Sequence, residues 1–372
     1  MKNLIFVFLL VFSMDSFAEE GDTTTLEPVV VEEAAVEPPL EYPSAFSTVI
    51  ELDDFGGEYN TTAEILSFSP GLTTRDFGGF GQLKTISIRG SSNDQVIILL
   101  DGVRINSPLG GGVDLSTIPI DYVESFEIIR GGASALAGSD ALGGVVNIVT
   151  KRIDKPFTNL SFTYGSFDTL SLNASRAQRL GNWGYFLSYT HAQSDGDFEF
   201  ESVNNLTLTR INNEFFSESF LGKIDYDLGD WKISLLNEFF FDDKGVPGLG
   251  EFQENSSNQE DLRNLTSLKI SKRPFLNSSL GFEMILFNRF DYLEFKDPSP
   301  TVGIPVDTLS KTFTFGMNPK LNWYVPYGQI VTFATEIRGD VLRDQDFDNP
   351  ERFTLSSYLS DEIHLFDGLL LI

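Results

Sequence analysis

The sequence predicts a mainly β protein, in which a small α+β domain precedes a long antiparallel sheet. Short apolar runs between Ile86 and Arg152 each end at a glycine turn, which is typical of buried strands. After Arg152 the pattern changes to strict alternation of apolar and polar residues, as in antiparallel strands with one apolar face. No internal apolar run reaches the roughly 18 residues of a membrane-spanning helix. A membrane location would therefore have to come from strands.

The composition narrows the class of protein. A length of 372 residues allows two domains or one large β structure, and a net charge of −28 argues against a nucleic-acid partner. The chain has no cysteine, and its two histidines, His191 and His364, are too far apart in sequence to suggest a metal centre or a catalytic triad. An aromatic content of 13%, with 34 Phe and 3 Trp, favours an outer-membrane type of sheet. A soluble β-sandwich fits this composition equally well.

The N-terminal region is predicted to be a leader followed by an arm. A lysine near the start, the apolar stretch Leu4–Phe12 and the small-x-small site Ser16–Ala18 predict a signal peptide over residues 1–18, with an uncleaved anchor as the alternative. Residues 19–44 are acidic and contain prolines, so we expect a flexible arm. Within it, Leu26–Val31 is a β-prone run, which strand addition to a partner's sheet would require. An ordinary linker is the alternative.

The α+β domain is predicted to contain short helices and two exposed loop tips. Thr61 begins a capping box with Glu64, which predicts a short helix, and Pro119 predicts a second one. The glycine-rich stretches Asp76–Leu83 and Asn106–Asp114 are predicted to be loop tips, because clustered glycines do not form stable regular elements. Neither is a phosphate-binding loop, because no Gly-Lys-Ser/Thr follows the glycines.

Four motifs in this domain carry a resemblance to a known family: Ile88–Gly90, Leu100–Arg104, Ile129–Gly131 and Gly138–Val149. In this order and spacing they resemble the plug domain of TonB-dependent outer-membrane receptors, closest to the vitamin B12 (cobalamin) and siderophore receptors. The resemblance implies that residues 45–152 are the plug. It implies that residues 153–372 are the N-terminal part of an antiparallel transmembrane β-barrel of about 22 strands. The implied plug-motif residues are Arg89, Gly90, Asp101, Gly102, Arg130, Gly131, Gly143 and Gly144.

The resemblance also implies contact sites. The run in the arm would be the TonB box, made of Leu26, Glu27, Pro28, Val29, Val30 and Val31. Both loop tips would contact the ligand, through Gly78, Gly79, Phe80, Gly81, Gln82, Leu83, Ser107, Leu109, Gly110 and Gly111. Plain turns without a ligand are the alternative for the tips. Because Arg89, Arg104 and Arg130 end apolar runs, we expect them at the rim of the plug sheet, in ion pairs with a surrounding wall.

The C-terminal part predicts strands of a barrel wall. Apolar side chains such as Val331, Phe333 and Ile337 alternate with polar ones, and short turns alternate with long polar loops. In outer-membrane barrels the short turns face the periplasm and the long loops face outside. We expect about ten strands, under half of a plugged barrel of about 22, and therefore a truncated or incomplete receptor. A small barrel of about ten strands is the alternative, although it could not enclose the plug.

The long loops are acidic and could hold Ca²⁺ through carboxylate oxygens. The candidate ligands are Asp195, Asp197, Asp242 and Asp243. A solvated acidic loop is the alternative, because these residues do not follow a fixed calcium-ligand spacing. Apart from this ion, no cofactor is expected.

The expected function is energised import across the outer membrane of a Gram-negative bacterium. The resemblance implies a scarce, bulky ligand and a pulling partner, TonB, energised by an ExbB–ExbD-type complex, with outer-membrane lipid around the wall. The glycine-rich tip favours a cobalamin-like corrinoid, and a ferric siderophore is the alternative. A passive porin, an adhesin or a non-functional truncated receptor ranks lower. An enzyme is not expected, because the sequence has neither a Gly-x-Ser-x-Gly elbow nor a histidine near a candidate nucleophile.

Overall fold

The computed structural model describes residues 46–55, 61–108, 112–131, 141–248, 250–253, 256–272, 279–301, 303–325, 329–345, 349–366 and 369–371. The predicted signal peptide, arm and TonB box therefore lie outside the described residues. Among the described residues, no helix is both long and apolar enough to cross a membrane.

The plug domain is built on a five-stranded sheet. In spatial order its strands are β1 (Phe46–Glu51), β6 (Val123–Arg130), β7 (Gly144–Thr150), β4 (Val96–Leu100) and β5 (Val103–Arg104). Strands β4 and β7 pair in parallel, and the other pairs are antiparallel. The apolar residues of β4 and β7 are buried on both faces of the sheet, as their unbroken apolar sequences predict. The hairpin of β2 (Leu72–Asp76) and β3 (Lys84–Ile88) holds the first loop tip between its strands.

The predicted capping box forms at the start of α2 (Thr62–Ser67). The Glu64 amide donates to the Thr61 hydroxyl at 3.4 Å, and the Thr61 amide donates to the Glu64 carboxylate at 2.6 Å. The second predicted short helix forms as the 3₁₀ turn η4 (Ile120–Tyr122), with Pro119 at its N-cap. The residues that follow are drawn into β6, which pairs with both β1 and β7. Two further 3₁₀ turns are η1 (Leu52–Phe55) and η2 (Asn93–Gln95), and η3 (Leu115–Thr117) precedes η4.

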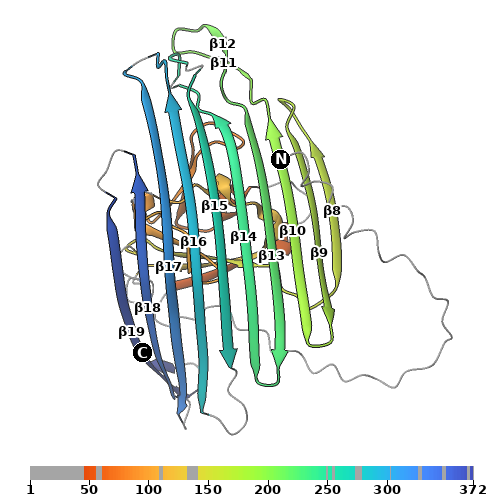
Figure 1. Cartoon of the computed structure of the whole chain (residues 1–372), viewed down its shortest axis with the longest axis vertical. Helices are drawn as coiled ribbons and strands as arrows, with labels where there is room; N and C mark the ends of the chain where they lie inside the picture. The colour runs from red at the N-terminus through yellow and green to blue at the C-terminus, as the bar shows by residue number, and fades with distance from the viewer. Residues whose placement is uncertain are drawn as a thin grey trace, which may run out of the picture. The chain divides into compact units, whose positions relative to one another are not determined.

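The remainder of the chain forms an eleven-stranded sheet, which we call the wall (Figure 1). Its neighbours in space are neighbours in sequence, and every described pair is antiparallel. Its strands are β8 (Phe157–Tyr164), β9 (Leu170–Leu180), β10 (Trp183–Ser194), β13 (Phe215–Leu228), β14 (Trp231–Gly245), β15 (Asn258–Lys272), β16 (Leu280–Asp297), β17 (Val306–Val325), β18 (Gln329–Asp344), β19 (Glu351–Phe366) and β20 (Leu369–Leu371). The connection between β10 and β13 carries a separate hairpin, β11 (Glu199–Glu201) and β12 (Thr207–Thr209).

The two faces of the wall differ as the alternation predicts. The face that we call inward packs against the plug: Phe186, Leu221 and Leu265 of the wall share one buried apolar cluster with Phe126 and Ile148 of the plug. The outward face carries exposed apolar side chains, including Leu160, Phe162, Phe315, Phe333 and Leu359. An apolar outer face is what lipid requires of a membrane sheet.

The short-turn end of the wall carries aromatic pairs on its outward face. The rings of Trp183 and Tyr226 lie 4.4 Å apart, and those of Trp231 and Phe282 lie 6.2 Å apart. The Lys272 ammonium lies 5.5 Å from the Trp231 ring centre. Aromatic girdles of this kind mark the membrane interface of outer-membrane barrels. These aromatic pairs mark one membrane interface at the short-turn end of the wall, which the sequence pattern predicts to face the periplasm.

The strands extend further into the long connections than the sequence predicts. Asp242 and Asp243 were expected in a loop, but they belong to β14, which continues to Gly245. The reason is that inward-facing polar groups here have partners on the plug, so the alternation continues beyond the last apolar residue. At the other end, two-residue turns close the hairpins at Gly181 and Gly229, both with φ near 60°.

Candidate functional site

The first loop tip is held by one carboxylate. Asp76 accepts hydrogen bonds from the amides of Gly78 and Gly79 at 3.1 and 2.9 Å, and its second oxygen pairs with the Lys84 ammonium at 2.7 Å. Partial burial alone would raise the pKa of Asp76, but the bonds from Lys84 and the two amides outweigh it and hold the pKa below its usual value. The tip is therefore a preformed loop with an ionised aspartate at its base.

This tip docks onto the long-loop end of the wall. Gln82 is 5% exposed and donates from Nε2 to the carbonyl of Gly245, at 3.0 Å. The Phe80 ring meets the Phe215 ring edge-on at 5.0 Å, and a Cβ on Gly81 would lie 2.3 Å from the same Phe215 ring. The side chain of Gln82, predicted to contact ligand, instead contacts the wall in this structure.

The exposed part of the tip is smaller and more apolar than predicted. Gly79 and Leu83 are exposed, Leu83 by 42%. The neighbouring Phe77, which sequence reasoning left out, is 57% exposed. Its position next to Gly78 and Gly79 could have identified Phe77 from the sequence, because exposed aromatic side chains beside loop tips commonly contact ligands.

The second tip is described only at its base. Leu109, Gly110 and Gly111 lie outside the described residues, and Ser107 is half-buried. The preceding Asn106 is buried and serves β4: its side chain accepts from the Ile98 amide at 2.8 Å and donates to the Val96 carbonyl at 2.9 Å. Ligand contact by this tip stays a prediction.

The plug-motif glycines shape turns. Arg89–Gly90 and Asp101–Gly102 are pairs of residues with positive φ, the backbone that tight two-residue hairpin turns require. Gly131 also has a positive φ, and a Cβ on Gly144 would lie 2.3 Å from the Ile129 carbonyl oxygen. Gly143 is equally confined, because its Cβ would lie 2.3 Å from the Ser91 hydroxyl. These motif residues therefore build the plug rather than bind a ligand.

The predicted ion pairs from plug arginines to the wall are wrong for Arg130. Its guanidinium donates to the Pro70 carbonyl at 3.0 Å, to the Thr48 hydroxyl at 2.6 Å and to the Ser69 hydroxyl, all within the plug. Burial, with a smaller effect of the neighbouring Arg89, lowers the pKa of Arg130 from its usual value. Arg130 therefore fastens β1 and the end of α2 to β6.

The cations that join plug and wall come from the wall. Four successive strands, β13 to β16, each direct one cation at the plug: Lys223, Lys244, Arg263 and Arg289. On the plug, the arginines donate to main-chain oxygens: Arg263 Nη2 donates to the Thr117 carbonyl at 3.0 Å, and Arg289 Nη1 donates to the Arg104 carbonyl at 2.7 Å. Lys223 lies 3.3 Å from Asp101 and donates to the Thr150 hydroxyl at 3.0 Å.

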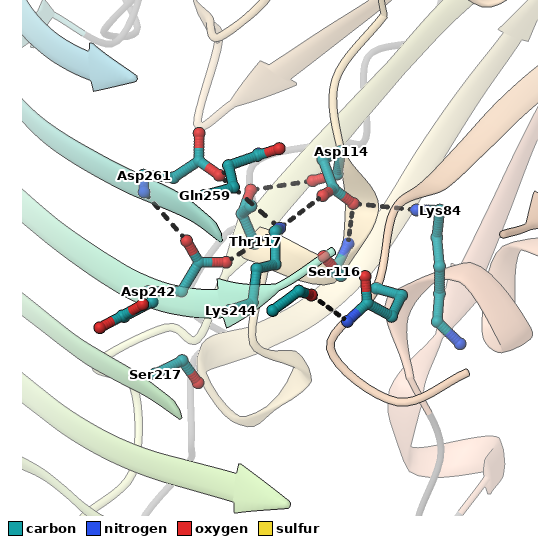
Figure 2. A network of polar contacts seen from close by, with 12 residues as sticks. Lys84, Asp114, Ser116, Thr117, Ser217, Asp242, Lys244, Gln259 and Asp261 are labelled. Carbon is teal, nitrogen blue, oxygen red and sulfur yellow. Dashed lines mark hydrogen bonds and ion pairs between the residues drawn. The ribbon is translucent and has the colours of Figure 1, made fainter. Parts of the chain in front are cut away.

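Lys244 is the centre of the largest polar network at this interface (Figure 2). Its ammonium lies 3.3 Å from Asp114 of the plug, and 3.1 and 3.6 Å from Asp242 and Asp261 of the wall. The other oxygen of Asp114 accepts from the amides of Lys84 at 3.0 Å and Ser116 at 2.9 Å. Asp114 thus joins the end of the first tip, the η3 turn and the wall at one carboxylate.

The predicted calcium ligands are not brought together by this arrangement. Asp242 is engaged by Lys244, while Asp243 points to the opposite side of β14 and accepts from Asn258 at 2.7 Å. Asp195 and Asp197 lie in the connection that follows β10. Within the described ranges, no cluster of three or more histidine, cysteine or acidic residues could hold a metal ion. A calcium site stays a prediction from sequence.

Comparison with known proteins supports the same architecture. Residues 41–145 match the family model described as the TonB-dependent Receptor Plug Domain. The fold resembles the siderophore receptor PiuA from Acinetobacter baumannii, with a TM-score of 0.66, 15% identity and coverage of 88% of this chain and 56% of that one. It also resembles the ferric citrate transporter FecA, with a TM-score of 0.70, 17% identity, and coverage of 87% and 54%. For the copper transporter OprC the values are 0.67, 16%, 85% and 50%.

A plug domain packed on the inward face of a sheet with an apolar outer face is the fold shared with the receptor and the transporters named above. Residues 41–145 are a TonB-dependent receptor plug domain, and the chain has the fold of these receptors. It spans about half the length of the solved structures that it matches. The predicted resemblance, fold class and outer-membrane location are confirmed at this level, and the named relatives are receptors and transporters rather than enzymes.

Proposed function

We propose that this protein is a TonB-dependent receptor for the energised uptake of a chelated metal, with a ferric siderophore as the favoured ligand. The named siderophore receptor, ferric citrate transporter and copper transporter support a metal chelate. The cobalamin-like corrinoid, our first expectation, has less support. It depended on the first tip, where Gly81 and Gln82 face the wall.

The observation that carries the proposal is the plug held against the inward face of the wall. A plug that shares a buried apolar cluster with β9 to β16, and is also bound by four wall cations, is packed against the described part of the wall. This favours gated transport over a passive porin. Energy must then come from outside the chain, because moving the plug requires these contacts to be broken.

The outer end of the molecule supplies apolar groups for a ligand. Phe77 and Leu83 are exposed on the first tip, beside the long-loop end of the wall. On the hairpin between β10 and β13, the Phe200 ring lies 5.3 Å from the Arg210 guanidinium and 6.4 Å from the Phe198 ring. Aromatic side chains of this kind bury the apolar parts of a chelate at little conformational cost.

The pulling partner would act through the arm. We propose that Leu26–Val31 adds as a strand to TonB, which an ExbB–ExbD-type complex energises. The arm leads into β1, an edge strand of the plug sheet whose partner is β6. Arg130 of β6 donates a hydrogen bond to Thr48 of β1. A force applied to the arm would therefore be transmitted through β1 to β6 in the plug sheet.

Uptake of labelled ligands tests the proposal. Cells producing the protein, with and without TonB, are given a labelled ferric siderophore panel and labelled cobalamin. We expect TonB-dependent uptake of a ferric siderophore, and deletion of residues 26–31 should abolish uptake while ligand binding to the cells persists. Uptake unaffected by TonB or by the deletion would refute energised import. TonB-dependent uptake of cobalamin alone would restore the corrinoid as the ligand.

A further inference from the structure

The polar contacts between plug and wall are distributed unequally among the wall strands. Strands β13 to β16 each contribute a cation to it, as described above. On β9 and β10, by contrast, Arg179 at the short-turn end is the one charged side chain among the described inward residues. Phe186 is inward as well and belongs to the apolar cluster shared with the plug. The remaining inward positions on these two strands are small, and most of them are polar. We call the following set the β9–β10 seam: Ser171, Asn173, Ser175, Ser188, Thr190 and, on the adjoining part of β13, Ser219.

Every member of the β9–β10 seam is buried, yet it makes little polar contact with the plug. In the described part of the chain, one hydrogen bond crosses from the inward side chains of β9 and β10 to the plug, from the Thr190 hydroxyl to Asp121 at 3.1 Å. Burial raises the pKa of Asp121, against the weaker opposing effects of Thr190 and Lys151. For the Asp121 carboxylate, the stabilisation by the Thr190 hydrogen bond is therefore smaller than the hydration free energy that is lost on burial.

Two seam hydroxyls have no hydrogen-bond partner among the residues that the structure describes. Ser175 and Ser219 are 0% and 3% exposed, and their oxygens are unpaired. Because buried hydroxyls are normally satisfied, these unmet bonds indicate a surface suited to water or to a polar ligand rather than to permanent dry packing. Serine is also among the smallest polar side chains, so this part of the wall leaves space when the plug moves.

A cavity of about 70 Å³ lies along the upper end of the seam, between plug and wall. Thr190 and Ser217 line it from the wall, and Lys84, Ser116 and Asp121 line it from the plug. The Ser116 oxygen is buried and unpaired as well. The cavity has room for a few waters, and most of its lining is apolar, including Phe215 and Phe240 of the wall. Phe80 and Gly81 of the first tip also border it, so it begins directly beneath the proposed ligand surface.

We propose that the plug stays attached to β13–β16 while it separates from β9 and β10, and that the β9–β10 seam lines the passage of the chelate. This inference rests on the proposed function. Separation at the seam breaks one hydrogen bond, exposes hydroxyls that water can satisfy, and removes Ala177 and Phe186 from the apolar cluster shared with the plug. Separation at β15 would instead break two hydrogen bonds from the charged Arg263 guanidinium to Thr117, at 3.2 and 3.0 Å. The ion pair between Arg263 and Glu238 lies within the wall and would stay intact.

Single cysteines test where the plug opens, because the chain has none of its own. Ser175→Cys and Ser188→Cys place a thiol in the seam, at side chains that are 0% and 1% exposed. Ser267→Cys is the matched control: Ser267 is 6% exposed, faces inward and lies on β15, the strand of Arg263. Each variant is labelled in cells with a small, charged, membrane-impermeant methanethiosulfonate, with and without TonB and with and without an uncoupler.

We expect energised TonB to raise the labelling rate several-fold at Ser175→Cys and Ser188→Cys, and to leave Ser267→Cys unchanged within about twofold, because only the seam opens. Equal increases at all three positions would mean that the whole plug leaves, and an increase confined to Ser267→Cys would place the passage on β15; either overturns the inference. The same holds if no thiol gains reactivity while uptake proceeds. Absence of TonB-dependent uptake in the unsubstituted protein would instead refute the proposed function, and the passage with it.

A reversible tether gives a second measurement. Asp121→Cys combined with Thr190→Cys is joined by a short, reducible, bifunctional thiol reagent across the one hydrogen bond of the seam. We expect uptake to stop on tethering and to return on reduction, while ligand binding to the cells is unchanged. Uptake that continues through a fully tethered seam would overturn the inference, and each single variant treated with the same reagent serves as the control.

Discussion

Arg289 Nη1 of the wall donates to the main-chain carbonyl of Arg104 in the plug, at 2.7 Å. The sequence suggested the opposite polarity, with arginines of the plug reaching out to acidic partners. In the structure the wall supplies the cation and the plug supplies a backbone oxygen, and the same holds for Arg263 and Thr117. These two contacts thus depend mainly on the course of the plug backbone, with one additional bond from Arg263 Nη1 to the Thr117 hydroxyl at 3.2 Å.

Arg263 and Glu238 should behave as a buried ion pair. Glu238 is 0% exposed, and Arg263 donates to both of its oxygens, at 2.7 and 3.1 Å. We expect Arg263→Met to lower the free energy of unfolding by about 3–5 kcal/mol, because it leaves a carboxylate buried and unpaired. Guanidinium unfolding in detergent measures this. The double variant with Glu238→Leu should recover most of the loss, and an equally unstable double variant would contradict the argument.

Gly81 should be indispensable for docking of the first tip. Its φ is +77°, and a Cβ would lie 2.3 Å from the Phe215 ring. We expect Gly81→Ala to release the tip, because neither the backbone nor the ring can accommodate the methyl group. Hydrogen exchange of residues 77–83 should then speed up. Adding Phe215→Ala removes the clash but keeps the backbone strain, so it should restore protection in part; no difference between the two variants would rule out the steric explanation.

Arg130 should fasten the strand that the arm pulls. Arg130→Gln removes charged hydrogen bonds to Pro70, Thr48 and Ser69, each contributing about 1.5–3 kcal/mol net of the bonds that water would make. We expect the amides of β1 to exchange faster, with little change in the wall. Arg89→Gln is the matched control, because Arg89 is exposed and exposed substitutions change stability by about 0.5 kcal/mol or less. Similar exchange in both variants would count against the fastening role.

The first tip should lose its anchor at low pH. The folded-state pKa of Asp76 is lowered, so its carboxylate contributes stability that is fully present above the usual aspartate pKa, about 3.9, and is lost as the pH falls through the lowered value. We expect Asp76→Asn to reduce the melting temperature at neutral pH, and the difference from the unsubstituted protein to vanish in strong acid. A difference that is constant from pH 7 to pH 2 would show that ionisation is irrelevant.

Features that depend on neighbouring residues could be predicted from the sequence. The capping box of Thr61 and Glu64 and the turn at Asp101–Gly102 follow from local backbone chemistry, and the wall follows from period-two alternation. The plug–wall contacts could not be predicted, because they join residues far apart, 130 positions for Lys244 and Asp114 and 185 for Arg289 and Arg104. A backbone carbonyl is also an acceptor that carries no signal in the sequence.

The main-chain acceptors of Arg263 and Arg289 have a consequence for engineering. A domain that is held largely through its backbone oxygens can be replaced by a related domain with the same backbone course. We expect a foreign plug that has the same turns at positions 104, 106 and 117, and that keeps the carboxylates of Asp101 and Asp114, to seat in this wall even where its other side chains differ. Arg289 also donates to the carbonyl of Asn106 at 3.0 Å. Chimaeras would then separate what the plug contributes to ligand choice from what the loops contribute.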